Sequence, residues 1–148
     1  MIIKKVFFDA NIFNDIFDKN RSTFGASHKA YIGALEKGIE VCTSCDIATN
    51  IYYITSKYTT KSNALDAIEL LKKSVTIIPF GADELAQTIT LMREDEDYKD
   101  FEDAIQYILA LNTMCDVIVS NDKRFVSKGL PCVSSEVFVR EWLEKNNI

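Results

Sequence analysis

The chain has 148 residues, of which 47% are hydrophobic and 26% are charged, and its formal net charge is −5. This size and composition fit one globular domain over residues 1–148 with a buried core, and they exclude a disordered chain. The negative charge gives no general attraction to nucleic acid, so an enzyme of this composition that acts on nucleic acid needs metal ions or a local basic rim.

Apolar patterning predicts strands that alternate with helices along the chain. Strands are predicted over 2–8, 40–43, 75–78, 116–119 and 131–133. Helices are predicted over 11–17, 23–36, 46–57, 62–73, 82–92, 100–112 and 136–145. This order indicates βαβ units, and therefore an α/β fold with a three-layer α/β/α sandwich around a central parallel sheet.

We expect no segment of this sequence to direct the protein to a membrane. No apolar run reaches the ~20 residues that a membrane-spanning helix needs. The apolar N-terminal run is interrupted at once by Asp9 and Asn11, so it is too short for the core of a signal peptide. We therefore expect a cytoplasmic protein with no membrane contact.

Carboxylates closely follow two of the predicted strands. Asp9 comes directly after the run 2–8, and Asp122 comes shortly after the strand 116–119. Because ligands bind at the carboxyl ends of parallel strands, these two acids are expected to lie at that edge of the sheet. A simpler explanation exists for each, because an aspartate before a helix or turn also caps free N–H groups. Asn11, two residues after Asp9, favours a functional site.

A third acidic segment, Asp100-Phe101-Glu102-Asp103, opens the helix predicted over 100–112. The helix dipole alone favours acids at this position. Asp100 and Asp103 are three residues apart and share a face, whereas Glu102 is expected to point elsewhere. Apolar residues follow Asp103, so its carboxylate is expected to border the buried face, where a charge is costly unless a cation meets it.

These acids together predict an oxygen-rich pocket for a divalent cation. Mg²⁺ binds a few carboxylates and keeps several waters, and such a cation can activate water and stabilise charge on a phosphate. Other chemistry has little support, because the chain lacks a glycine-rich phosphate loop and its single histidine, His28, falls in mid-helix. We expect His28 to be a surface or packing residue.

The four cysteines are expected to be free thiols in a reducing compartment. Cys42 and Cys45 have the spacing of half a zinc or redox site, but Cys115 and Cys132 lie too far apart to form a second half. Packing is therefore the favoured role, and a metal or redox role is the alternative.

In three segments the chain resembles a PIN domain, the nuclease fold of the VapC-like toxins of type II toxin–antitoxin pairs. The segments that carry the resemblance are Phe-Phe-Asp-Ala-Asn-Ile-Phe at 7–13, Asp-Phe-Glu-Asp-Ala-Ile-Gln at 100–106 and Ile-Val-Ser-Asn-Asp-Lys-Arg-Phe at 118–125. The resemblance spans nearly the whole chain. It implies a Mg²⁺- or Mn²⁺-dependent endoribonuclease in which Asp9, Asp103 and Asp122 bind the metal and carry catalysis. RNA as substrate, a cognate antitoxin and a homodimer are the partners it implies.

The chain departs from the family pattern at one place. The family carries a second acid on the helix after the second strand, and Asn50 stands at that position. An amide oxygen can bind a metal but carries no charge. Asp46, one turn earlier on the same face, either compensates for the missing acid or caps the helix. Supporting roles at the site are therefore expected for Asn11, Asp46, Asn50 and Asp100.

Three other functions are open alternatives. A haloacid-dehalogenase-like phosphatase also has an aspartate after its first strand, but it needs a second one where this chain has Asn11. A phospho-acceptor receiver domain needs its aspartate after the third strand, where this chain has Pro79-Phe80. The strongest alternative is a PIN-like module that binds RNA or protein and has lost or weakened catalysis, because Asn50 replaces the expected acid.

Four cations are candidates for contacts with RNA. Lys57 and Lys61 flank the end of the helix predicted over 46–57, and Lys123 and Arg124 directly follow Asp122. They are predicted to form the basic rim that an acidic protein needs to hold RNA, and ordinary solvated surface charge is the alternative.

Aromatic side chains gather on the second and third predicted helices and at the residue that follows the third. They are Phe24, Tyr31, Tyr52, Tyr53 and Tyr58. Because aromatic residues are enriched at the cores of interfaces, this set predicts a surface for a homodimer or an antitoxin. The alternative is that these rings fill the core of the domain itself.

Overall fold

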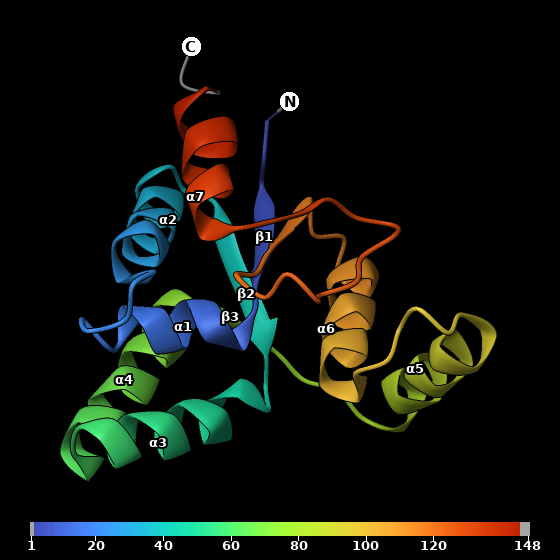
Figure 1. The fold of residues 1–148 in the computed structure, drawn as a ribbon, viewed down its shortest axis with the longest axis horizontal. Helices are drawn as coiled ribbons and strands as arrows, with labels where there is room; N and C mark the ends of the chain where they lie inside the picture. The colour runs from blue at the N-terminus through green and yellow to red at the C-terminus, as the bar shows by residue number, and fades with distance from the viewer. Residues whose placement is uncertain (1, 146–148) are drawn as a thin grey trace.

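The computed structural model describes residues 2–145 and contains a five-stranded parallel sheet (Figure 1). The strands are β1 (Lys5–Phe8), β2 (Glu40–Ser44), β3 (Thr76–Ile78), β4 (Val117–Val119) and β5 (Cys132–Val133). They lie in the order β3-β2-β1-β4-β5, and each neighbouring pair is parallel. β1 is therefore the central strand.

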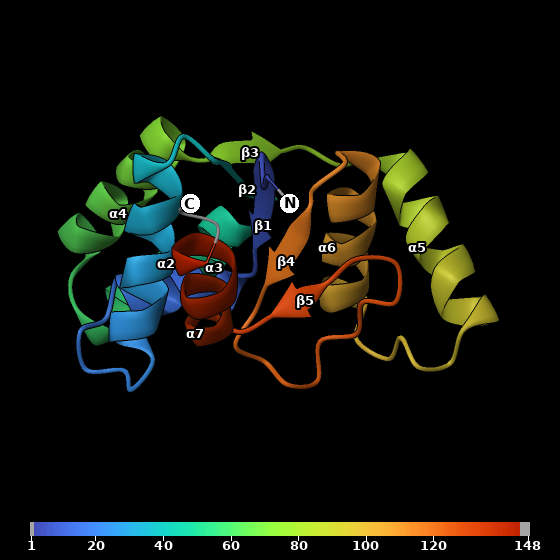
Figure 2. The same cartoon turned by 90° about the horizontal axis from the view of Figure 1, so that it is seen from above.

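Helices cover both faces of this sheet, which confirms the predicted three-layer α/β/α sandwich. They are α1 (Ala10–Ile16), α2 (Phe24–Glu36), α3 (Ile47–Tyr58), α4 (Lys61–Ser74), α5 (Ala82–Glu94), α6 (Phe101–Asn112) and α7 (Ser135–Val137), followed by the π-helical segment η1 (Phe138–Glu144). Figures 1 and 2 show α1 to α4 and α7 on one side of the sheet and α5 and α6 on the other. None of the helices within residues 2–145 has the length and apolar character needed to cross a membrane.

The side chains of β1 hold the two helical layers to the sheet. Val6 and Phe8 belong to the core shared with α1, α2 and η1, whereas Phe7 belongs to the core shared with α6. This division follows from the geometry of a strand, in which successive residues point to opposite faces. All three side chains are fully buried. Strand positions that are buried on both faces of a sheet must be apolar, which explains why Val6, Phe7 and Phe8 are consecutive apolar residues.

The register between β1 and β4 places the residues that come directly after these two strands side by side. Phe8 pairs with Val119, and the Asp9 N–H donates to the Val119 carbonyl oxygen at 3.0 Å. From β1 the chain passes outward to β2 and β3, and it then returns to the other side of β1 as β4. The boundary between β1 and β4 is thus a topological switch point, where open α/β sheets bind their ligands.

The first strand is shorter than the sequence pattern predicts, because it begins at Lys5 rather than at residue 2. β2 starts opposite Lys5 and β4 starts opposite Val6, so earlier residues have no neighbouring strand. The N–H groups of Lys4 and Lys5 instead donate to the Asp116 carboxylate at 2.8 and 3.0 Å. The available partners, and not the apolar character of the segment, set the start of the strand.

The last predicted helix, 136–145, consists of α7 and the π-helical segment η1. In a π-helix each N–H bonds to the carbonyl five residues earlier, so residues five apart lie near the same face. Phe138 and Leu143 are five apart, and both are buried. Packing of these two side chains against the core accounts for the wide turn, which no local sequence signal reveals.

Replacing Phe138 by alanine should lower the free energy of unfolding by about 3–5 kcal/mol, the usual cost of truncating a buried phenylalanine. The ring is fully buried and meets Phe8 edge-on, with 6.0 Å between the centroids. Urea denaturation followed by circular dichroism measures the change. Leu65→Ala is the matched control, because Leu65 is 60% exposed. Equal losses for the two variants would contradict this packing.

Candidate active site

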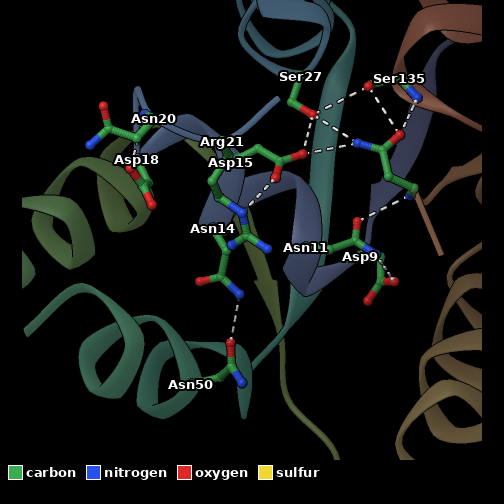
Figure 3. Close-up of polar contacts among 11 residues, drawn as sticks. Asp9, Asn11, Asn14, Asp15, Asp18, Asn20, Arg21, Ser27, Asn50 and Ser135 are labelled. Atoms are coloured by element: carbon green, nitrogen blue, oxygen red, sulfur yellow. Dashed lines mark hydrogen bonds and ion pairs between the residues drawn. The ribbon is translucent and has the colours of Figure 1, made fainter. Parts of the chain in front are cut away.

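Asp9 lies at the carboxyl end of β1 and is the N-cap of α1. It is 5% exposed, and its Oδ1 accepts a hydrogen bond from the Ala10 N–H at 2.7 Å. Its Oδ2 accepts a hydrogen bond from the Ser120 hydroxyl at 2.7 Å. The same oxygen accepts one from the Asn11 amide at 3.1 Å (Figure 3). Burial raises the pKa of Asp9, and the Asp122 carboxylate adds to the rise. Asp9 therefore caps a helix and also places a carboxylate where ionisation is costly.

Asp122 reaches the same edge of the sheet from β4. Its N–H donates to the Ser120 Oγ at 3.1 Å, and this is the hydroxyl that donates to Asp9. Its Oδ1 accepts from the Arg124 N–H at 2.9 Å and from the Arg124 Nε at 3.3 Å. These bonds, the backbone one first, hold the pKa of Asp122 below its ordinary value. Asp122 is therefore the most acidic of the three predicted core carboxylates.

The N-terminus of α6 supplies the third predicted carboxylate. Asp100 is the N-cap, and its Oδ1 accepts from the Asp103 N–H at 2.9 Å. Asp103 is half-buried at the cavity wall. Burial raises the pKa of Asp103 to about 7, followed by the effects of the carboxylates of Asp9, Asp100 and Asp122. The carboxylates that follow β1, open α6 and follow β4 thus lie close enough to raise the pKa of Asp103 by charge repulsion.

A cavity of about 670 Å³ opens beside Asp103 and Asp122. The lining residues are Asp97, Tyr98, Lys99, Asp100, Asp103, Ala104, Asp122, Arg124 and Val126. Its volume is in the range of small-molecule binding pockets. The exposed side chains of Lys99 and Arg124 place positive charge at the cavity, close to the carboxylates.

Glu102 is exposed and does not line the cavity, but its carboxylate still interacts with the charges of the site. Partial burial raises the pKa of Glu102, and the carboxylates of Asp46 and Asp9 raise it further. Asp46 makes no side-chain cap hydrogen bond to α3, and its carboxylate accepts one from the Ser44 hydroxyl. Asp46 therefore contributes its charge to the site region without serving as a side-chain cap.

Asn50 directs its amide oxygen to another asparagine. Its Oδ1 accepts a hydrogen bond from the Asn14 Nδ2 at 3.0 Å, as Figure 3 shows. The position where the family pattern has an acid thus contributes a neutral side chain whose oxygen already has a partner.

The structure separates the four predicted cations. Lys57 Nζ lies 5.5 Å from the ring centroid of Tyr58, at the last turn of α3. It is eleven residues beyond Asp46, so at 1.5 Å per residue the helix carries it about 16 Å away. Lys61 lies further along the chain, at the start of α4. Arg124 lines the cavity, and the exposed Lys123 precedes it.

Three residues near the carboxylates were missed by the sequence analysis. Ser120 bridges Asp9 and the Asp122 N–H, as described above. Gln106 is 2% exposed, its side-chain hydrogen bond lowers the pKa of Asp9, and its spacing of three residues from Asp103 is a signal that could have revealed it. Burial raises the pKa of the Cys132 thiol to about 12, and Asp9 and Asp103 add to the rise. No local sequence signal places Cys132 there.

The donor set fits a Mg²⁺ or Mn²⁺ ion. Carboxylate oxygens are preferred ligands. Burial and then the neighbouring carboxylates raise the pKa of Asp103, and a bound cation would offset both effects. The buried Gln106 Oε1 has no hydrogen-bond partner in the described part of the chain. Within residues 2–145, no three Cys, His, Asp or Glu side chains are grouped closely enough to hold an ion. Mg²⁺ does not need such a group, because it typically binds one or two carboxylates and keeps several waters.

The other candidate groups from the sequence lie outside this site. Cys42 and Cys115 are buried free thiols in the core on the α6 face, and Cys45 is a half-buried free thiol. His28 is exposed and stacks on the Phe24 ring with 5.4 Å between the centroids, as predicted for a surface residue.

Comparison with known proteins identifies the family of this domain. A family model for the PIN domain matches residues 5–124, so the chain belongs to the PIN-domain family. Within that family it is similar to Ribonuclease VapC1 of Aquifex aeolicus (strain VF5). The two are 39% identical over 139 residues, which cover 94% of this chain and 96% of that protein.

Solved structures with the same fold include two VapC-type proteins. VapC20 of Mycobacterium tuberculosis, a toxin described as cleaving the sarcin-ricin loop, has a TM-score of 0.67 and 17% identity, covering 81% of this chain and 92% of that one. VapBC2 of Rickettsia felis, bound to a DNA fragment from its promoter, has a TM-score of 0.65 and 16% identity, covering 86% of this chain and 96% of that one. At these identities the likeness establishes the fold alone.

Asp103→Asn should stabilise the protein in EDTA. After allowance for solvent screening of this half-exposed group, the gain in melting temperature should be at least about 3 °C larger at pH 8 than at pH 5. The folded pKa of about 7 is above the unfolded value of about 4, so ionisation of Asp103 removes stability as the pH rises between them. Asparagine does not ionise. Thermal melts at both pH values test this, with the exposed Asp66→Asn on α4 as the control. A gain that is independent of pH would contradict the raised pKa.

Proposed function

We propose that this chain is a Mg²⁺- or Mn²⁺-dependent endoribonuclease in which Asp9, Asp103 and Asp122 carry catalysis and bind the cation, one or two of them directly and the rest through its waters. The proposal depends above all on the coupling of these carboxylates, which contributes to raising the pKa of Asp103 to about 7. Membership of the PIN-domain family and 39% identity to Ribonuclease VapC1 support it.

The cation, when bound, supplies an activated water and stabilises the charge that develops on the phosphate. The chain's own residues position the ligands. The Ser120 hydroxyl donates to Asp9 and accepts from the Asp122 N–H, so it connects the two acids. Asn11 fixes the orientation of Asp9. Asp103 must be ionised to bind a cation, so affinity for the metal should rise as the pH passes through about 7. Supporting negative charge comes from Asp46 and Asp100.

RNA would lie across the cavity, with its phosphates against the exposed cations there. Lys99, Lys123 and Arg124 are the cations of this part of the surface, and they supply locally the positive charge that the whole chain lacks. Lys57 lies at the far end of α3 and Lys61 at the start of α4, so both are left out of this rim.

We also infer that the chain is the cytoplasmic toxin of a type II toxin–antitoxin pair, with a cognate antitoxin as its partner. Its fold is shared by proteins of a VapBC2 structure and of a toxin–antitoxin complex from Klebsiella pneumoniae. Tyr53 and Tyr58 are 63% and 65% exposed and offer aromatic surface for an antitoxin or a second copy of the chain. Tyr31 is buried against Phe13, so it belongs to the core of the domain.

Asp103→Asn should reduce RNA cleavage by about 100-fold or more, because a cation contributes several kcal/mol of transition-state stabilisation. The assay uses the purified chain on structured RNA with Mg²⁺ or Mn²⁺, an EDTA blank and Asp66→Asn as the control. If Asp103→Asn cleaves at the parent rate, the site assignment is wrong. If the parent binds RNA but cleaves none, the result favours the non-catalytic binding module, in which the neutral Asn50 has replaced an acid.

Reversing the charges at Lys123 and Arg124 should weaken RNA binding and reduce the salt slope by about two, because each of these cations would neutralise one phosphate. Lys57→Glu/Lys61→Glu is the matched control, because it makes the same change of net charge away from the cavity. Fluorescence anisotropy in EDTA, over a range of salt concentrations, measures binding without cleavage. Equal effects of the two pairs would show that only net charge matters.

A further inference from the structure

A buried ionic network lies behind the carboxylates, outside the cavity. Asp15 on α1 is 2% exposed, and its Oδ1 pairs with the Arg21 Nε at 3.1 Å. Its Oδ2 accepts hydrogen bonds from the Ser27 hydroxyl at 2.7 Å and from the Asn121 Nδ2 at 2.9 Å (Figure 3). Burial of a charge is costly without such partners, so the position of Asn121 is tied to that of Asp15.

The side-chain amide of Asn121 forms hydrogen bonds through both its nitrogen and its oxygen. Its Nδ2 also donates to the Ser27 Oγ at 3.0 Å, and its Oδ1 accepts from the Ser135 N–H at 2.9 Å and from the Ser135 Oγ at 3.1 Å. A donor is thus needed toward Asp15 and an acceptor toward Ser135. A flipped amide satisfies neither side, and an aspartate satisfies only the Ser135 side.

The network continues from Asn121 to two of the proposed metal ligands. The Asn121 N–H donates to the Asn11 Oδ1 at 3.1 Å, and the Asn11 Nδ2 donates to the Asp9 Oδ2 at 3.1 Å. Asn121 is also the residue that joins Ser120 to Asp122 in the chain. It therefore reaches Asp9 through one hydrogen-bonded side chain and Asp122 through one peptide bond.

We propose that Asn121, held in place by Asp15, is a positioning residue that fixes the distance between Asp9 and Asp122 and thereby sets the affinity for the divalent cation. The inference rests on the proposed metal-dependent function. Neither Asn121 nor Asp15 lines the cavity, so they act through the ligands and not on the substrate. Hydrogen-bond partners that orient metal ligands typically contribute 10–100-fold to metal affinity.

Titration calorimetry with Mn²⁺ alone tests this proposal. Asn121→Ala should bind Mn²⁺ at least about tenfold more weakly than the parent. Asn112→Ala is the matched control, because it also removes a side-chain hydrogen bond of an asparagine, the one from Asn112 on α6 to Gln87 on α5. This variant should keep the parent affinity. Asn121→Asp should bind more weakly still, because it places a second carboxylate against Asp15. Adding Asp15→Asn should recover affinity, since the new amide can donate to the new carboxylate.

Cleavage assays add a readout that loss of stability does not move. In Asn121→Ala the Mn²⁺ concentration for half-maximal cleavage should rise, while the rate at saturating Mn²⁺ stays near that of the parent. A structural defect alone would lower the rate by reducing the folded fraction and leave the half-maximal concentration unchanged.

The possible outcomes distinguish the positioning role from the metal-dependent function. A folded Asn121→Ala variant with parent affinity for Mn²⁺ overturns the positioning role. If that variant does not fold, Ser27→Ala, which removes one hydroxyl from the network, carries the test: weaker Mn²⁺ binding supports the role and parent affinity overturns it. A parent protein that binds no Mn²⁺ overturns the proposed metal-dependent function itself.

Discussion

The parallel pairing of β1 with β4 is the contact on which the site depends. Because Phe8 lies beside Val119, the residues that follow, Asp9 and Ser120, meet at the edge of the sheet. A slip of one residue would turn the side chains of β1 to the wrong layers, and a slip of two would move β4 by about 7 Å relative to β1. The apolar core forbids both, so the packing of Val6, Phe7 and Phe8 also fixes the distance between the acids.

The site works against the stability of the fold that holds it. Burial raises the pKa values of Asp9 and Asp103, which means that the folded protein resists ionisation of these groups. Crowded carboxylates are functional when a cation neutralises them, and perturbed pKa values are common at such sites. Only part of the repulsion is offset locally, by Ser120 and by backbone N–H groups. The two cores on either side of β1 supply the remaining stability.

The sequence predicts the parts of this protein that depend on local pattern. Alternating strands and helices indicate the sandwich, and acids after the strands indicate the edge at which Asp9 and Asp122 gather. Features that depend on tertiary contacts are not visible in this way. The pKa of Glu102 is raised by burial and then by Asp46, which is distant in sequence. Asn50 turns to Asn14 because α1 and α3 pack together. The π-helical end of the chain likewise arises from packing.

The hydrogen bonds of Ser135 to Asn121 make the helical segment after β5 part of the site. The ribosome has already synthesised every acid of the carboxylate cluster when it reaches Asp122, but the two Ser135 donors and the helical segment that follows come later. A nascent chain that stops before Ser135 lacks the groups that lock the turn after β4. For a nuclease made among the RNAs of its own cell, the order of synthesis thus delays the complete site until the segment after β5 has docked.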